Sequence, residues 1–225
     1  MTSMSVFLTT LASTWHTLLP TTALLRPPQT PQNPSLTAKI ANLHVHPTLE
    51  TLLHILNHDL PSAHFLVRHM QAPPAVEGML LHSILHRAEG DFRNARLWAG
   101  DVVDACEGFV PKHRGEGRRL GEEVLGKIEA GKGMDAVSLV EYVYGEEGPG
   151  GLIDAVEKWR KDGEGEEREI EERIRKECER LLEWCRSKFG EGEWLDASEA
   201  WVRHSDEVRE ISGEMVTGGK GFRKF

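Results

Sequence analysis

The stretch HSILHRAEGDFRNARLW, residues 82–98, determines the fold predicted for this chain. Before Glu89, its apolar residues follow the three- and four-residue steps of an amphipathic helix. Gly90 suits the left-handed position that ends a helix, and Asp91 suits the N-cap that begins the next one. The helical step then resumes at Phe92, Ala95 and Trp98. The stretch therefore predicts a helix, a tight turn and a second helix.

The same pattern occurs 32 residues earlier in the chain. Four residues before each turn and four after it align: Leu49, Leu52, Leu53 and His54 with Leu81, Ile84, Leu85 and His86, and Asp59, Leu60, Ala63 and Leu66 with Asp91, Phe92, Ala95 and Trp98. Pro47 and Pro74 lie near the expected helix starts, where a missing N–H costs nothing. Because a period of this length indicates stacked helix pairs, we predict two hairpins over residues 47–105.

The segment EGDFRNARLW resembles the turn and second helix of a tetratricopeptide repeat, with Gly-Asp-aromatic, then alanine, then an aromatic residue. The chain departs from that family in its period of 32 rather than 34. It also carries His82 and His86 where the family mostly has apolar or small residues. The resemblance implies an all-α fold of two tetratricopeptide-like hairpins whose first helices line a concave, peptide-binding face. Since two units bury little surface, flanking helices must cap them.

The opening stretch is also similar to a group of uncharacterised helical proteins that share the signature His-Arg-x-Glu-Gly-Asp-x-x-Asn-Ala-x-x-Trp. In this chain the signature is formed by His86, Arg87, Glu89, Gly90, Asp91, Asn94, Ala95 and Trp98. This second resemblance implies a fold and no activity.

The domain organisation that we expect is a single helical domain over residues 1–225. Residues 1–25 carry a loose helical stripe and are predicted to be a docking helix. Residues 26–36 form a proline-rich linker, because their prolines exclude a helix interior and a central strand. The repeat core follows at 47–105, and residues 114–225 are predicted to form an acidic helical region.

Two helices stand out in the acidic region. The segment 166–189 has apolar residues one turn apart throughout, which predicts the strongest helix of the chain. Asp196 followed by Glu199 resembles a capping box. It predicts a last helix that carries Trp201 and Met215 on one side.

The composition excludes several classes of protein. The chain has a net charge of −9, with 28 acidic and 20 basic residues in the part from 114 to 225, so nucleic acid and anionic membrane surfaces are poor partners. The apolar residues 6–25 are interrupted by His16 and Pro20, which argues against a spanning helix.

Three cysteines without a CxxC motif fit a reducing compartment, so we expect a cytoplasmic protein. A mitochondrial location is the alternative, although only Arg26 offers the positive charge of a transit peptide.

The histidines are the main anomaly, since eight of the eleven lie between His44 and His86. The candidate binding residues are His54, His58, His82, His86, Arg87 and Glu89. His82 and His86 share a helix face and can chelate one ion, with Glu89 one turn further on as a third ligand. His54 and His58 repeat this spacing in the first unit. Neither pair forms HExxH, because the residue after the first histidine is Ile55 in one pair and Ser83 in the other. These imidazoles can equally well flank the apolar stripe and bridge helices.

Arg87 is expected to form a structural ion pair with Glu50, Glu89 or Asp91, and a binding role is the alternative.

No phosphate-binding loop or GxSxG motif is complete, so the sequence predicts no cofactor and no catalytic residue. We therefore expect a protein- or peptide-binding module without catalysis, and the sequence predicts no oligomeric state. In a stack, His54 and His86 would lie about 10 Å apart along a bound peptide. One alternative function is a small metal-binding protein or enzyme that uses His82, His86 and Glu89. Another is a scaffold whose groove is filled by its own C-terminal helix.

Overall fold

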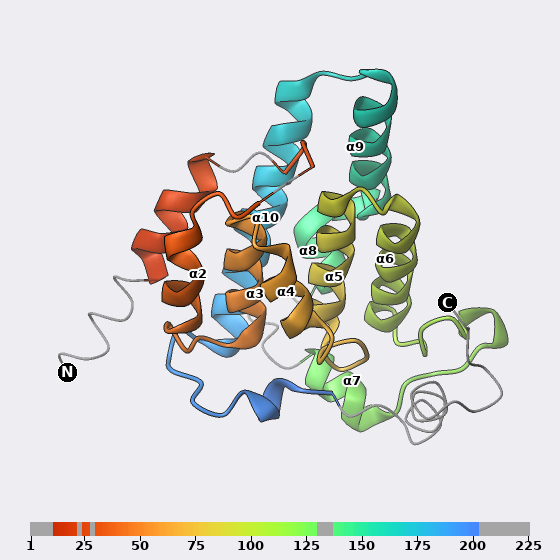
Figure 1. Cartoon of the computed structure of the whole chain (residues 1–225). Coiled ribbons are helices and arrows are strands. Elements are labelled where there is room, and N and C mark those ends of the chain that lie inside the picture. Colours follow the sequence, from red (N-terminus) through yellow and green to blue (C-terminus); the bar gives the residue numbers. More distant parts are fainter. Residues whose placement is uncertain (1–10, 22–23, 28–29, 130–136, 203–225) are drawn as a thin grey trace, which may run out of the picture.

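The computed structural model describes residues 11–21, 24–27, 30–129 and 137–202 (Figure 1). Within these residues the regular elements are helices, apart from one isolated antiparallel bridge between Phe109 and Arg119. The predicted all-α class is confirmed. None of the described helices combines the length and apolar character that a membrane crossing requires.

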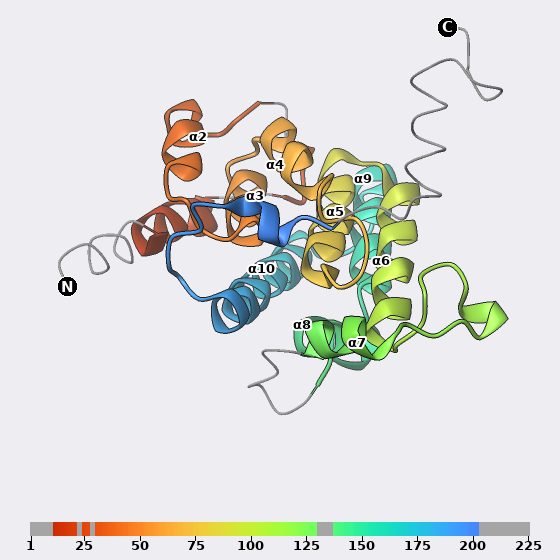
Figure 2. The same ribbon diagram turned by 90° about the horizontal axis from the view of Figure 1, so that it is seen from below.

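Two helical hairpins form the centre of the molecule. Helix α3 (Pro47–Leu56) packs against α4 (Leu60–Val67), and α5 (Val76–Glu89) packs against the longer α6 (Phe92–Cys106). Helix α4 also contacts α5, so the two hairpins lie side by side (Figures 1 and 2). The helix–turn–helix predicted from residues 82–98 is therefore present.

Local sequence explains both tight turns. Asp59 and Asp91 are the N-caps of α4 and α6, and their side chains accept hydrogen bonds from the backbone N–H of Ser62 and Asn94. Their backbone angles are nearly equal, with φ/ψ of −87/68° and −84/71°. The preceding residues, His58 and Gly90, both adopt positive φ, as the end of a helix before such a turn requires. These caps confirm the predicted roles of Asp59, Gly90 and Asp91.

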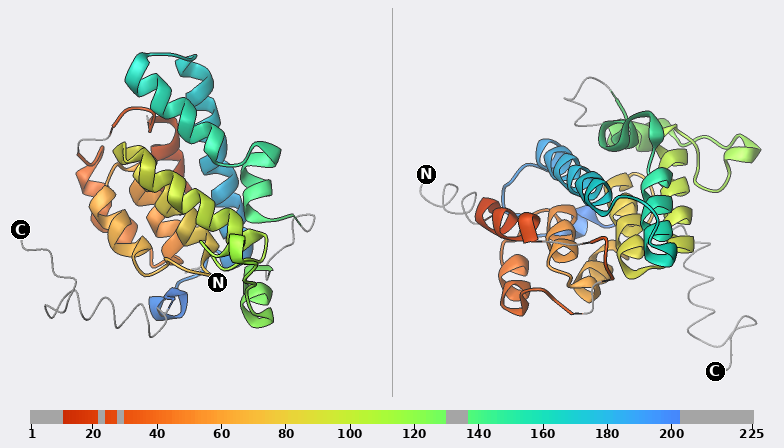
Figure 3. Two further views of the ribbon diagram at one scale, coloured as in Figure 1. Left: turned by 90° about the vertical axis from the view of Figure 1, so that its right-hand side faces the viewer. Right: turned by 90° about the horizontal axis from the view of Figure 1, so that it is seen from above.

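The acidic region forms a third layer. It contains α7 (Glu122–Glu129), α8 (Leu139–Tyr144), α9 (Gly150–Asp162) and α10 (Glu167–Phe189). Helix α10 confirms the helix predicted over 166–189. It pairs with α9, and this pair projects beyond the central hairpins (Figures 1 and 3).

Helix α10 covers the side of α3 that faces away from α4 (Figure 2). It also reaches α5, where the indole N–H of Trp184 donates to the buried carboxylate of Glu77 over 2.8 Å. The main hydrophobic core cluster runs through the molecule from Leu11 to Cys185 and includes residues of α3, α5 and α10. A smaller cluster joins Ala95, Ala99 and Ile153. The first helices of the two hairpins are thus covered by the chain's own C-terminal region.

The N-terminal segment packs on this core where it is described. Residues 11–18 are helical, and Leu11, Trp15 and Leu18 are buried, as expected for a docking helix. Helix α2 (Pro34–Ala41) begins inside the predicted linker, because Asn33 caps it and Pro34 occupies the first turn, where proline is tolerated. The residues before 11 lie outside the described part of the chain.

The prediction of a last helix that begins at Asp196 is wrong for its first residues. Asp196 does cap a helix, but that helix is a short 3-10 turn, Ala197–Ala200, and Trp201 is already extended. The backbone N–H of Val202 then donates to the carbonyl of His69 over 2.8 Å, which holds this segment against the end of α4. The remainder of the predicted helix, including Met215, lies outside the described residues.

Candidate functional site

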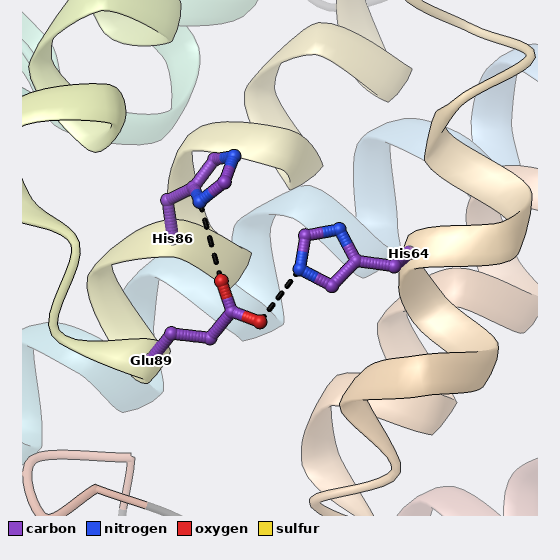
Figure 4. Close-up of side chains that lie close together, drawn as sticks. All are labelled: His64, His86 and Glu89. Atoms are coloured by element: carbon purple, nitrogen blue, oxygen red, sulfur yellow. Dashed lines mark hydrogen bonds and ion pairs between the residues drawn. The ribbon is translucent and has the colours of Figure 1, made fainter. Parts of the chain in front are cut away.

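A cluster of imidazoles lies where α4 meets α5. His82, His86 and Glu89 are spaced by four and three residues, so they occupy one face of α5. His64 approaches this face from α4 (Figure 4). Because Asp59 fixes where α4 begins and Gly90 fixes where α5 ends, these two residues also fix how the side chains meet.

The carboxylate of Glu89 lies between two imidazoles (Figure 4). The Nε2 atom of His64 is 2.6 Å from one of its oxygens, and the Nδ1 atom of His86 is 3.2 Å from the other. The ring centroids of His64 and His86 are 5.4 Å apart. One donor atom from each of these three residues lies within 4.8 Å of the other two, which is a spacing that suits a metal ion.

The electrostatics of the cluster favour an ionised carboxylate. Burial would raise the pKa of Glu89, but the hydrogen bonds and charges of His64 and His86 outweigh it and lower that pKa to about 2. The carboxylate is therefore negative at neutral pH. Burial, with smaller effects from His86 and His64, lowers the pKa of His82 from 6.5 to about 3, so this imidazole is neutral.

His82 lies in a column of stacked rings. Its ring is 4.8 Å from that of His86 with 13° between the planes, and 4.2 Å from that of Trp98 with 20° between the planes. The side chain is buried, and its Nδ1 atom has no hydrogen-bond partner among the described residues. The predicted donor His82 is thus adjacent to His64, His86 and Glu89, but it is not one of the three converging donors.

The other two predicted histidines have different surroundings. His54 is buried between two carboxylates, with Nδ1 3.2 Å from Asp59 and Nε2 3.6 Å from Glu50. His58 occupies the left-handed position of the first turn, with φ of 58°, and burial lowers its pKa. Both residues therefore have structural roles in the first hairpin.

Arg87 forms a structural ion pair, as expected, but its partner is none of the three that were predicted. Its guanidinium makes a two-pronged contact with Glu177 of α10, and the Nη1–Oε1 distance is 2.8 Å. The hydroxyl of Tyr144 donates to the same carboxylate. Arg87 lies on the face of α5 that meets α10, so it cannot reach Glu50, Glu89 or Asp91 in this arrangement.

His64 is the donor that the sequence analysis missed. It is one of the clustered histidines, but 22 residues separate it from His86 in the chain. Helical spacing relates residues within one helix only. The pairing of His64 with Glu89 depends on how the first hairpin packs on the second.

Two imidazoles and one carboxylate form a ligand set for a borderline transition metal such as zinc or ferrous iron. The fold and the site thus define an all-α protein with a histidine–carboxylate cluster between two helical hairpins. No protein-family model, curated protein or solved structure matches this chain.

Proposed function

We propose that this protein binds one divalent transition-metal ion through His64, His86 and Glu89. The observation that carries the proposal is the convergence of three donors from two hairpins within 4.8 Å. Metal ligands must be deprotonated, and the pKa of Glu89, lowered to about 2, satisfies this condition at neutral pH. This is the metal-binding alternative raised by the sequence, with His64 in place of His82 in the ligand set.

The donors need only a small rearrangement to bind an ion. Tetrahedral ligands with bonds of about 2.0–2.1 Å lie about 3.3 Å from one another. The two contacts of Glu89, at 2.6 and 3.2 Å, involve its two different oxygens. The donor atoms lie within 4.8 Å of one another and would close to this spacing around an ion. The side chains of His64 and Glu89 are 22% and 30% exposed, so they have room to turn and an ion can reach them.

Such an ion would connect two units of the fold. His64 belongs to the first hairpin, whereas His86 and Glu89 close the first helix of the second. A ligand that binds only the folded state stabilises that state. We therefore assign the ion a role in holding α4 against the C-terminal end of α5.

We further propose that the two hairpins are tetratricopeptide-like repeats. The equal cap geometry of Asp59 and Asp91 supports this, and so does the complete burial of the aligned Ala63 and Ala95. Because α10 covers α3 and α5, a peptide can bind along these first helices only if α10 moves away from them.

Protein binding remains a second candidate function, favoured by one observation. Phe65 and Leu97 are large apolar residues that are 63% and 52% exposed, and they lie 32 residues apart on the second helices α4 and α6. Exposed apolar residues at matching positions can anchor an apolar protein surface. We expect a Phe65→Ser, Leu97→Ser double variant to lose any partner that the native protein retains in affinity purification, while its thermal unfolding stays the same. An unchanged set of partners would contradict this candidate.

Calorimetric titration with zinc tests the metal proposal. The native protein should bind one ion per chain, and His64→Ala should weaken binding at least tenfold because one of three ligands is lost. His113→Ala is the matched control, since His113 is 39% exposed and pairs with Glu116, away from the cluster. Equal affinities for the native protein and His64→Ala would refute the proposed site.

A further inference from the structure

We infer that His82 is the fourth ligand of this ion, so that four protein donors close the site. The inference rests on the proposed metal-binding function and extends it from an open three-ligand site to a closed one. His82 precedes His86 by one helical turn, so both project from the same face of α5. None of the roles described above accounts for its unpartnered ring nitrogen.

The three imidazoles are arranged around one point. Their ring centroids form a triangle with sides of 5.4 Å (His64–His86), 5.8 Å (His64–His82) and 4.8 Å (His82–His86). The centre of such a triangle lies about 3 Å from each corner, and an ion bound at about 2.1 Å from a ring nitrogen lies about 3.2 Å from the ring centroid. At these centroid distances, one ion lies within bonding reach of all three rings once each ring turns a nitrogen toward it.

The burial of His82 supports a ligand role. The residue is 5% exposed, and its Nδ1 atom lies where no described group bonds it. Buried polar atoms without a partner are rare because they lose their hydrogen bonds to water. Coordination to the ion gives the His82 ring a polar partner once the ring has turned toward the ion.

One local movement is required. The rings of His82 and His86 are nearly parallel, at 13°, whereas an ion shared by two imidazoles lies in the plane of each ring. A turn of the His82 ring about its Cβ–Cγ bond brings a nitrogen toward the ion, and this torsion is soft in histidine. Trp98, which is stacked 4.2 Å from His82, forms an apolar wall on the other side of the ring.

The number of ligands decides what the site does. Zinc sites with four protein ligands are structural, whereas catalytic sites keep a position open for water or substrate. With His64, His82, His86 and Glu89 all bound, the ion has no open position. The site then serves to join the two hairpins and does not activate a substrate.

Cobalt(II) is the probe, because the ion absorbs visible light strongly when it has four ligands and weakly when it has five or six. The native protein should bind one cobalt with strong bands that do not change when azide is added. His82→Ala should bind cobalt at least tenfold more weakly, and its spectrum should respond to azide because one position is open. His82→Phe, which keeps the stack on Trp98, should behave in the same way and serves as the control for folding.

The outcomes separate this inference from the metal proposal. If the native protein binds cobalt through His64 but its spectrum changes with azide, the site is open and the inference is wrong. Unchanged affinity and spectrum in both His82 variants would also overturn it, while leaving the three-ligand site intact. If the native protein binds no cobalt at all, the metal proposal fails and the inference fails with it.

Discussion

Arg87 and Glu177 form an ion pair whose side chains are only 2% and 1% exposed. Removing one partner leaves the other charge buried without compensation, which costs about 3–5 kcal/mol. We predict that Arg87→Met lowers the free energy of unfolding by an amount in this range, measured by urea denaturation. Arg96→Met is the control, because Arg96 pairs with Asp154 and Glu157 at the surface and such pairs contribute about 0–1 kcal/mol. Equal losses in the two variants would contradict the assigned role of Arg87.

His46 is predicted to make stability depend on pH. Burial, assisted by the charge of Lys188, lowers its pKa from 6.5 to about 3. Its ring is stacked 3.7 Å from Phe189, and Nδ1 accepts a hydrogen bond from the backbone N–H of Thr48, which requires the neutral ring. As pH falls below about 6.5 the unfolded chain takes up this proton first, so stability decreases between pH 6.5 and 3.

The matched variant is His46→Asn, which keeps a side-chain acceptor at the N-cap of α3 but does not titrate in this range. Each pKa unit corresponds to about 1.4 kcal/mol, so between pH 7 and 5 the native protein should lose about 2 kcal/mol more than the variant. Urea denaturation at both pH values measures the difference. Parallel pH profiles would show that His46 does not carry this dependence.

Which residue roles follow from the sequence depends on how local they are. The caps at Asp59 and Asp91 and the turn at Gly90 were predicted, because a cap involves residues within one helical turn. The partner of Arg87 was not, since Glu177 lies 90 residues away in the chain. His64 was missed for the same reason, because its partner Glu89 belongs to another helix.

At the level of helices, Gly90 controls where α5 ends and therefore where Glu89 lies. Its φ of 95° is costly for any residue with a side chain. We predict that Gly90→Ala destabilises the protein by about 1–2 kcal/mol. Gly100→Ala, in the middle of α6 with no neighbouring atom within 4 Å of the new methyl group, should instead stabilise it by about 0.5–1 kcal/mol. Thermal unfolding of the two variants should show shifts of opposite sign, and equal signs would contradict the assigned turn.

Helices with a continuous apolar stripe were predictable, whereas the last helix was not. Ile170, Ile174, Cys178 and Leu181 are buried along α10, which matches the pattern read from 166–189. The capping pattern at Asp196 and Glu199 starts only a short 3-10 turn. A cap satisfies the N–H groups of the first turn, but it does not supply the buried stripe that extends a helix.

On the scale of the whole molecule, the proposed ion links the two hairpins. Zinc at one hundred times its dissociation constant should raise the free energy of unfolding by about 2.7 kcal/mol. At the same zinc concentration a tenfold weaker site should leave about 1.4 kcal/mol or less in His64→Ala, whereas the full increase should persist in His113→Ala. Urea denaturation with and without zinc measures it, and an equal increase in the His64 variant would place the ion elsewhere.

The arrangement of the hairpins was predictable in part. The offset of 32 residues places two helix pairs next to each other, but it contains no information on what covers α3 and α5. That cover is α10, which depends on contacts such as Trp184–Glu77 between residues 107 positions apart. The sequence therefore leaves open whether the first helices line an open peptide-binding face or are covered by the C-terminal helices, and in the structure α10 covers them.

The most direct test of the central claim is anomalous diffraction at the zinc edge from crystals grown with one equivalent of zinc. We predict one peak per chain, about 2.0–2.2 Å from donor atoms of His64, His86 and Glu89. Zinc bound only at other residues, or no peak between α4 and α5, would contradict the claim.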